Sequence, residues 1–289
     1  MMTHVLLDSD RVDISTTGDA VSLGGVLCGL KDIDGWHNGP GVRKNRADRL
    51  WAHGEFSERG WRTARLITIS GHIRTTTRAE AGGFVDRLAT VFADGTPGQF
   101  IFTDPDLGTR WANCTLEGAP KTAWTQQTRI DWELELLAAD PRKYGLPVEA
   151  AGGVPVDGGA LAFDLFTQGT MGVLDFGAPG STGVVELTNV GTADTAPVFT
   201  VTGTMPSGFT VENRATGARL VFAGAVVTGQ VVRLDSGSGD VTVNGVDRGV
   251  LLVRREWEML DPGETGSWVL TAADSVGALM VVEVIPAWW

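Results

Sequence analysis

The clearest alternation of apolar and polar positions runs from Ile130 to Leu136. A period of two is typical of a strand with one buried and one solvated face, and here it outweighs the helix preference of Leu and Glu. Pro141 cannot donate a hydrogen bond to a neighbouring strand, so the strand must stop at Asp140. The predicted buried face is Ile130, Trp132, Leu134 and Leu136, and the solvated face is Asp131, Glu133 and Glu135.

One amphipathic helix is predicted between Thr77 and Gly95. Thr77 and Glu80 have the spacing of a capping box, and apolar residues then recur at helical spacing until Gly95 ends the helix. The pair Gly82-Gly83 weakens this helix by about 1 kcal/mol per glycine, so tertiary packing must hold its first turns. The apolar stripe consists of Phe84, Leu88, Val91 and Phe92.

Short alternating runs on both sides of this helix predict further strands. A single helix among strands is expected to cover one face of a sheet, which gives an α+β architecture for the first half of the chain. Gly71, inside one of these runs, marks a bulge or a close approach of two backbones. The predicted strands are residues 5–7, 26–33, 66–73, 99–102, 110–117 and 122–124.

Residues 40–65 differ from their surroundings because they are both basic and aromatic. Turn points at Gly54 and Gly60 favour a long twisted hairpin, a projecting arm. The alternative is a solvated loop. Such a hairpin could also hold single-stranded nucleic acid, but docking on an acidic protein surface is favoured. The segment carries Arg43, Lys44, Arg46, Arg49, Arg59, Arg62 and Arg65, interleaved with Trp51, Phe56 and Trp61.

After Tyr144 the composition changes, and the rest of the chain has an all-β pattern. Residues 146–159 are rich in Gly and Pro, which predicts a flexible linker between domains of residues 1–145 and 160–289. Short apolar runs then recur about every 8–12 residues, as in an antiparallel β-sandwich, and Asn244-Gly245 is the strongest hairpin signal. The protein is therefore predicted to be mainly β. The predicted strands are 184–187, 198–201, 209–211, 219–222, 231–234, 241–243, 257–260, 268–270 and 279–285.

Length and charge limit the partners of the protein. The 289 residues are enough for two domains, and the net charge of −12 is unevenly divided. Residues 1–150 contain 17 Lys or Arg against 20 Asp or Glu, whereas residues 151–289 contain 6 against 15. The acidic second half would repel phosphates, which argues against duplex DNA as its ligand. No apolar run approaches the roughly 20 residues that span a bilayer, and a cytoplasm-like compartment is expected.

The sequence contains no catalytic or metal-binding signature. The histidines are scattered and Cys28 and Cys114 lack ligand spacing, so we expect no metal, no cofactor and two buried thiols. Glu256 and Glu258 would point the same way from one strand, about 7 Å apart, which is typical of a solvated face rather than of glycosidase acids. Neither a nucleophile elbow nor a phosphate-binding loop is present. We therefore expect a non-enzymatic protein.

The order of these features in residues 20–145 resembles the N-terminal domain of siphophage distal tail proteins. The resemblance rests on Gly71 after an alternating strand, the helix ending at Gly95, the aromatic strands around Phe100 and Trp111, and the segment A-D-P-R-K-Y-G that ends at Gly145. It implies β-sheets with one helix and a projecting hairpin arm, assembled as a six-membered ring at the end of the tail tube.

The second half resembles the C-terminal sandwich of distal tail or minor tail proteins of actinobacteriophage type. The matching segments are N-V-G-T-A-D-T-A-P-V-F (189–199), R-L-D-S (233–236), V-T-V-N-G (241–245) and D-P-G-E (261–264). Glu264 stands where the family pattern usually has Asn. Such sandwiches resemble galectin-like and carbohydrate-binding modules, but likeness of fold alone does not identify a ligand.

Two functions follow as expectations from this resemblance. The leading one is a structural virion protein, a distal tail (baseplate hub) subunit assembled in the bacterial host cytoplasm. Its partners would be further copies of itself in a hexameric ring, the tail tube protein and a tail-tip protein. The alternative is a tail module that binds host-surface glycan through its sandwich. The candidate aromatics for glycan binding or docking are Trp257, Trp268, Trp288 and Trp289.

The ring is expected to close when the arm of one subunit reaches over an acidic surface of the next. A single exposed ion pair contributes only about 0–1 kcal/mol, so the aromatic residues of the arm must supply apolar anchors. Neither membrane insertion nor sequence-specific nucleic-acid binding is expected. The hypothetical interface comprises Arg43, Lys44, Arg46, Arg49, Trp51, Phe56, Arg59, Trp61 and Arg62 of the arm with Asp131, Glu133 and Glu135 of the acidic strand.

Overall fold

The chain divides into two compact units in a computed structural model. One unit comprises Met1–Leu146 together with Trp288–Trp289, and the other comprises Pro147–Ala287. The last two residues, which we predicted to lie in the sandwich domain, therefore group with the first unit. The structure describes residues 4–7, 12–15, 21–23, 26–92, 95–104, 106–156, 162–163, 174–175 and 180–289.

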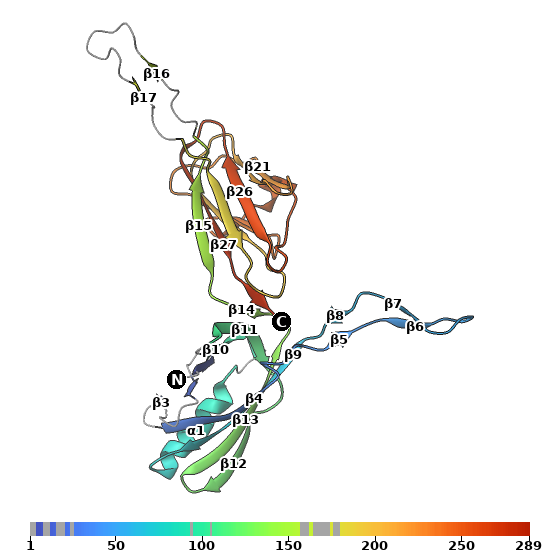
Figure 1. The fold of residues 1–289 in the computed structure, drawn as a ribbon. Helices are drawn as coiled ribbons and strands as arrows, with labels where there is room; N and C mark the ends of the chain where they lie inside the picture. Colours follow the sequence, from blue (N-terminus) through green and yellow to red (C-terminus); the bar gives the residue numbers. More distant parts are fainter. Residues whose placement is uncertain are drawn as a thin grey trace. The chain divides into compact units, whose positions relative to one another are not determined.

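The first unit is built on an 11-stranded sheet, in the order β12-β13-β9-β4-β2-β1-β10-β11-β14-β28 with β3 beside β4 (Figure 1). Strand β13 also pairs with β11, so the strand pairing closes on itself. The strands are β1 (His4–Leu7), β2 (Val12–Ser15), β3 (Val21–Leu23), β4 (Val26–Asp34), β9 (Arg65–Arg74), β10 (Gly98–Asp104), β11 (Gly108–Leu116), β12 (Lys121–Gln126), β13 (Arg129–Ala138), β14 (Lys143–Tyr144) and β28 (Ala287–Trp288).

Strand β13 has the two faces that its sequence predicts. Ile130, Trp132 and Leu134 are buried in the core, whereas the residues between them are half-exposed. β13 pairs along its whole length with β9, from Arg129 opposite Arg74 to Ala138 opposite Arg65. Alternating burial in both strands therefore gives one apolar face, on which the core of the unit is built.

Helix α1 (Arg78–Thr90) begins with the predicted capping box, in which Thr77 and Glu80 bond to each other's backbone. It packs with its apolar stripe on the core of the sheet, and the rings of Phe84 and Trp132 are 6.4 Å apart. The expected end at Gly95 is wrong. The chain leaves the helix at Val91, which has extended backbone angles, because Val91 and Phe92 both turn into the core.

The second unit is a sandwich of two antiparallel sheets, as its spacing predicts. Their strand orders are β15-β27-β19-β22-β23-β24 and β18-β26-β20-β21-β25. Asn244 and Gly245 both have positive φ in the turn between β23 and β24, which confirms that hairpin. The strands are β15 (Val148–Gly153), β16 (Ala162–Phe163), β17 (Leu174–Asp175), β18 (Val184–Thr188), β19 (Val198–Thr204), β20 (Phe209–Asn213), β21 (Arg219–Phe222), β22 (Val231–Asp235), β23 (Val241–Val243), β24 (Val246–Asp247), β25 (Leu252–Arg255), β26 (Thr265–Thr271) and β27 (Val276–Val284).

Two expectations for the second half are corrected. Residues 148–153, inside the expected linker, form β15 and pair with β27 from Val148 to Gly153, because this edge position tolerates small residues. Residues 257–260 do not form a strand, and the strand lies just before them as β25. The signal was misread because β25 buries only Leu252 and leaves Val253 two-thirds exposed, so apolar alternation is missing.

Glycines 71 and 82 provide a matched test of the packing in the first unit. A Cβ atom at Gly71 would lie 2.5 Å from both the Gly29 carbonyl oxygen and the Trp132 ring, whereas one at Gly82 meets nothing within 4 Å. We predict that Gly71→Ala lowers the free energy of unfolding by about 1–3 kcal/mol. Gly82→Ala, in the helix, should raise it by about 0.5–1 kcal/mol. Urea unfolding measures both, and equal effects of the two substitutions would contradict the close approach at Gly71.

Candidate functional site

The basic aromatic segment forms the predicted arm. It consists of two short ladders, β5 (Val42–Arg43) with β8 (Trp61–Arg62), and β6 (Arg46–Asp48) with β7 (Glu55–Ser57) (Figure 1). The tip turns where the backbone N–H of Arg49 donates to the Gly54 carbonyl at 3.2 Å, and Gly54 has the positive φ of a turn. Gly60 is not a turn point. Its missing side chain instead lets the two strands approach, because a Cβ atom there would lie 2.5 Å from Val42.

The arm exposes most of its large apolar side chains. Trp51 is 97% exposed and Leu50 87%, while Phe56 and Trp61 are each about three-fifths exposed. Two of the arm's own cations lie over its aromatic rings, Arg49 over Phe56 at 5.1 Å and Arg59 over Trp61 at 5.2 Å. Such contacts hold the rings in place but cover little of their surface, so the arm presents apolar area that a protein partner could bury.

The root of the arm is held by two buried cations. Arg65 is only 1% exposed, and its guanidinium donates to four backbone carbonyls, those of Gly35, Trp36, Asn38 and Pro141. Arg65 therefore does not belong with the exposed basic residues of the arm, among which the charge pattern placed it. Lys143 is 4% exposed, and its ammonium group donates to the Trp36 carbonyl at 3.1 Å.

Sequence reasoning missed this pair because Arg and Lys are normally solvated. The available signal was positional. Arg65 begins a strand whose odd-numbered positions up to Ile73 are all on the buried face, and Lys143 follows Pro141 in the A-D-P-R-K-Y-G segment. In the same segment, Asp140 accepts hydrogen bonds from Arg142 and from the Tyr144 hydroxyl. The segment is thus a structural junction, in which each polar side chain has a partner in its own unit.

The acidic face of β13 is also neutralised within its own chain. The Lys121 ammonium lies 2.7 Å from a Glu133 oxygen and 2.6 Å from a Glu135 oxygen, and Arg129 lies 3.6 Å from Asp131. Hydrogen bonds to Glu133 and Glu135 raise the pKa of Lys121. These carboxylates therefore do not need the arm as a source of positive charge. Among the described residues, no ion pair joins the arm to this face.

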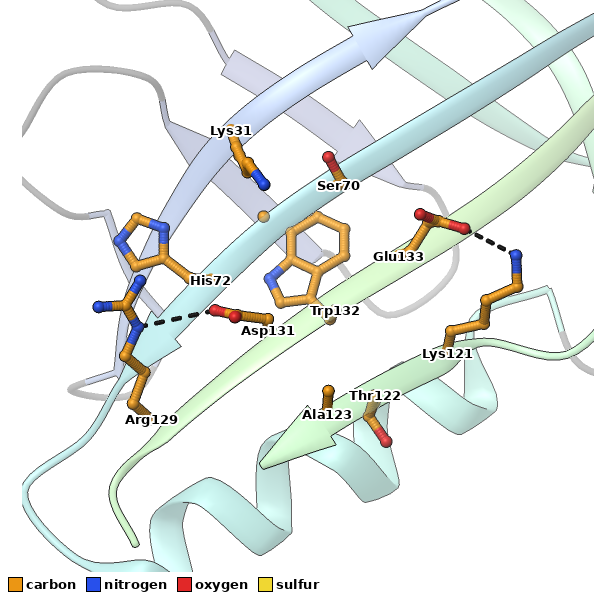
Figure 2. Close-up of a pocket in the computed structure, with 11 residues that line it drawn as sticks. Lys31, Ser70, His72, Lys121, Thr122, Ala123, Arg129, Asp131, Trp132 and Glu133 are labelled. Atoms are coloured by element: carbon orange, nitrogen blue, oxygen red, sulfur yellow. Dashed lines mark hydrogen bonds and ion pairs between the residues drawn. The ribbon is translucent and has the colours of Figure 1, made fainter. Parts of the chain in front are cut away.

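A hollow of about 370 Å³ lies on this face of β4, β9, β13 and β12 (Figure 2). It forms because small residues such as Ala123 and Ser70 stand between longer ones. The imidazole of His72 lies over Gly29, since a Cβ atom there would be 2.9 Å from the ring. Lys31 and His72 have no hydrogen-bond or ion-pair partner among the described residues, whereas Asp131 and Glu133 are paired. The mixture of both charge signs suits a protein surface with matching groups.

The aromatic residues proposed for glycan binding are mostly not available for it. Trp268 is 3% exposed and packs edge-on against Phe199 in the sandwich core, at 5.5 Å between ring centroids. Trp257 is half-buried against the same core. Trp288 and Trp289 group with the first unit, where Arg110 lies over Trp288 at 4.2 Å and Arg62 over Trp289 at 5.3 Å. The expectation that Trp268 could form a sugar platform is wrong, because its burial leaves no free ring face.

No helix in the described part of the chain is long and apolar enough to cross a membrane. The Cys114 thiol is buried as expected, and burial raises its pKa to about 12, so it is protonated and unreactive at neutral pH. The side chain of Cys28 lies outside the described residues.

Comparisons with known proteins agree on one group. Residues 190–278 match the family model of the siphovirus-type tail component, C-terminal domain. The crystal structure of phage SPP1 Dit (gp 19.1), described as a paradigm of the hub adsorption apparatus in phages that infect Gram-positive bacteria, has a similar fold. It is 13% identical, with a TM-score of 0.69 over 100% of both chains. A chain of the activated phage p2 baseplate with calcium is 9% identical, with a TM-score of 0.54 over 98% of this chain and 97% of that one. No curated protein sequence matches. The resemblance to siphophage distal tail proteins is thus confirmed.

The buried Lys143 makes stability depend on pH in a defined window. Burial, and then the charges of Arg65 and Arg110, lower the pKa of Lys143 from 10.5 to about 8. Between these values the unfolded chain binds a proton that the folded chain lacks, so the free energy of unfolding should rise with pH from about 8 to 10.5. This rise should be missing in Lys143→Met and kept in the control Lys31→Met. Urea unfolding at several pH values measures it, and the same pH slope in wild type and Lys143→Met would contradict the prediction.

Proposed function

We propose that this chain, whose residues 190–278 match the siphovirus-type tail component family, is a distal tail subunit, a structural protein of the baseplate hub of a long-tailed phage. The observation that carries the proposal is the likeness to the SPP1 hub protein, which extends over the whole length of both chains and not over one domain only. The family match in the second unit supports the same assignment independently of the fold. The role is non-enzymatic and belongs to the tail tip of the virion, after assembly in the host cytoplasm.

The subunits assemble into a closed ring of six, in which each contact joins two different surfaces of neighbouring copies. The arm supplies one of these surfaces. Its tip offers Trp51 and Leu50, almost fully exposed, and its shaft offers Phe56 and Trp61. Aromatic residues with arginine between them dominate the energetics of many protein interfaces, and these rings are held partly ordered by Arg49 and Arg59.

The second surface is the acidic face of β13 with the hollow beside it. Glu133 and Asp131 line this hollow, together with Lys31 and His72, for which the described part of the chain offers no hydrogen-bond or ion-pair partner. Because Lys121 and Arg129 already neutralise the carboxylates, the arm contributes apolar contact first and exchanges ion pairs second. The ring joins the tail tube protein on one side to a tail-tip protein on the other. Glycan binding has less support, since Trp268 is a core residue and Trp288 lies under Arg110.

The first test of the ring removes the exposed tryptophans of the arm. Trp51→Ala with Trp61→Ala should abolish rings seen by native mass spectrometry or negative-stain imaging, because loss of a buried aromatic anchor typically costs about 2 kcal/mol or more per site. Leu107→Ala, at another exposed apolar position of the first unit, is the control and should assemble normally. Normal rings from the double variant would show that the arm is not the clasp.

The second test exchanges charges between the arm and the acidic strand. Glu133→Lys should weaken the ring, and Arg46→Glu or Arg62→Glu in the same chain should partly restore it, because the neighbouring copies then regain opposite charges. The substitution also places a cation beside Lys121, so Glu133→Lys is compared in a Lys121→Met background. The dissociation constant from native mass spectrometry at low salt is the readout. If neither arm substitution restores assembly, the acidic strand is not the surface that the arm grips.

A further inference from the structure

The chain leaves the first unit for the arm after β4 and returns at β9, and one guanidinium joins both points. Arg65 is the first residue of β9. Its Nη1 atom lies 2.7 Å from the Gly35 carbonyl oxygen, 3.2 Å from that of Trp36 and 2.6 Å from that of Asn38. These three carbonyls belong to the outgoing segment. The side chain therefore cross-links the two ends of the arm at its root.

The same cations tie the root to the rest of the unit. The Arg65 Nε atom donates to the Pro141 carbonyl at 2.9 Å, and Lys143 donates to the Trp36 carbonyl at 3.1 Å. The Trp36 side chain is itself 2% exposed, with its ring 4.9 Å from that of Phe100 in the core. Trp36 therefore fixes the outgoing segment in two ways. Its ring packs in the core, and its carbonyl oxygen accepts hydrogen bonds from both Arg65 and Lys143.

Burial of Arg65 and Lys143 is not an efficient way to increase the stability of the fold. Neither Arg65 nor Lys143 forms an ion pair with a carboxylate among the described residues, and the Nη2 atom of Arg65 has no hydrogen-bond partner. Burying two like charges is costly, and apolar side chains of similar volume often stabilise a protein as well or better. What the planar fork of arginine adds is geometry, because it binds carbonyls of separate segments in fixed directions.

We propose that Arg65 and Lys143 are positioning residues that set the direction in which the arm leaves the first unit, so that ring assembly requires them although both are buried. The proposal rests on the role of the arm in the proposed function. An arm held at its root reaches a neighbouring subunit with part of its conformational entropy already lost, which lowers the entropic cost of binding.

Hydrogen–deuterium exchange of the dissociated subunit tests the positioning by itself. In Arg65→Lys the charge remains, but one ammonium group cannot reach the carbonyls of both Pro141 and Asn38. In Lys143→Met, the Trp36 carbonyl keeps its hydrogen bond to Arg65, so this variant disturbs the root of the arm less and is expected to fold even if Arg65→Lys does not. In both variants, the backbone amides of residues 36–64 should exchange at least about tenfold faster than in wild type, including the Thr63 amide that donates to the Gly41 carbonyl. The amides of β13 should exchange at the wild-type rate. The exposed Arg87→Met, in helix α1 and outside both proposed ring surfaces, is the control.

A purely structural role predicts a different result. Faster exchange spread evenly over residues 36–64 and β13, or no change in residues 36–64, would overturn the proposal. Assembly is then measured on the same variants by native mass spectrometry, where at least about a tenfold weaker association is expected. Local loosening with normal rings would likewise overturn it, since the arm would then not need its direction fixed. Failure of the proposed function gives a different result. If the arm does not hold the ring together, Trp51→Ala with Trp61→Ala leaves ring assembly unchanged, and the amide exchange of residues 36–64 also stays at the wild-type rate.

Discussion

The path of the chain at the root of the arm depends on a charge that is removed from water. Arg65 donates hydrogen bonds to carbonyls of two stretches of chain that are far apart in sequence, residues 35–38 and Pro141. A buried guanidinium is tolerated only where several acceptors surround it, so the path of each stretch is constrained by the other. This single requirement connects the arm, the start of β9 and the turn after β13, which would otherwise be separate features of the sheet.

The elements that sequence reasoning predicted well are those with a strong local signal. The alternation from Ile130 to Leu136, the capping box at Thr77 and the Asn244-Gly245 turn each fix their structure through interactions within a few residues. The helix end at Gly95 failed because burial of Val91 and Phe92 prevailed over a local stop signal. The partners of Arg65 and Lys143 could not be predicted at all, since they are carbonyls brought together by tertiary structure, and a carbonyl has no sequence signature.

The sequence also did not show where the carboxylates of β13 find their cations. Three carboxylates on one strand face suggested a need for cations from elsewhere, but β12 lies beside β13 in the sheet and supplies Lys121 opposite Glu133. Cross-strand neighbours of opposite sign are an ordinary way to solvate such a face. In the proposed interface, exposed aromatic rings are therefore expected to contribute more to binding than ion pairs do. In the proposed ring, the exposed Trp51 would then contribute more to binding than any arginine of the arm.

The A-D-P-R-K-Y-G segment also pairs with the last strand of the sequence. Strand β14, which contains Lys143, and strand β28, which ends at Trp288, are neighbours in the sheet of the first unit, so the second unit is inserted between two strands of the first. Cutting the chain after Leu146 would remove Trp288 from over Arg110 and Trp289 from beside Arg62, a residue of the arm. The first unit is therefore complete only with residues from both ends of the sequence, and its assembly is best studied in the full chain.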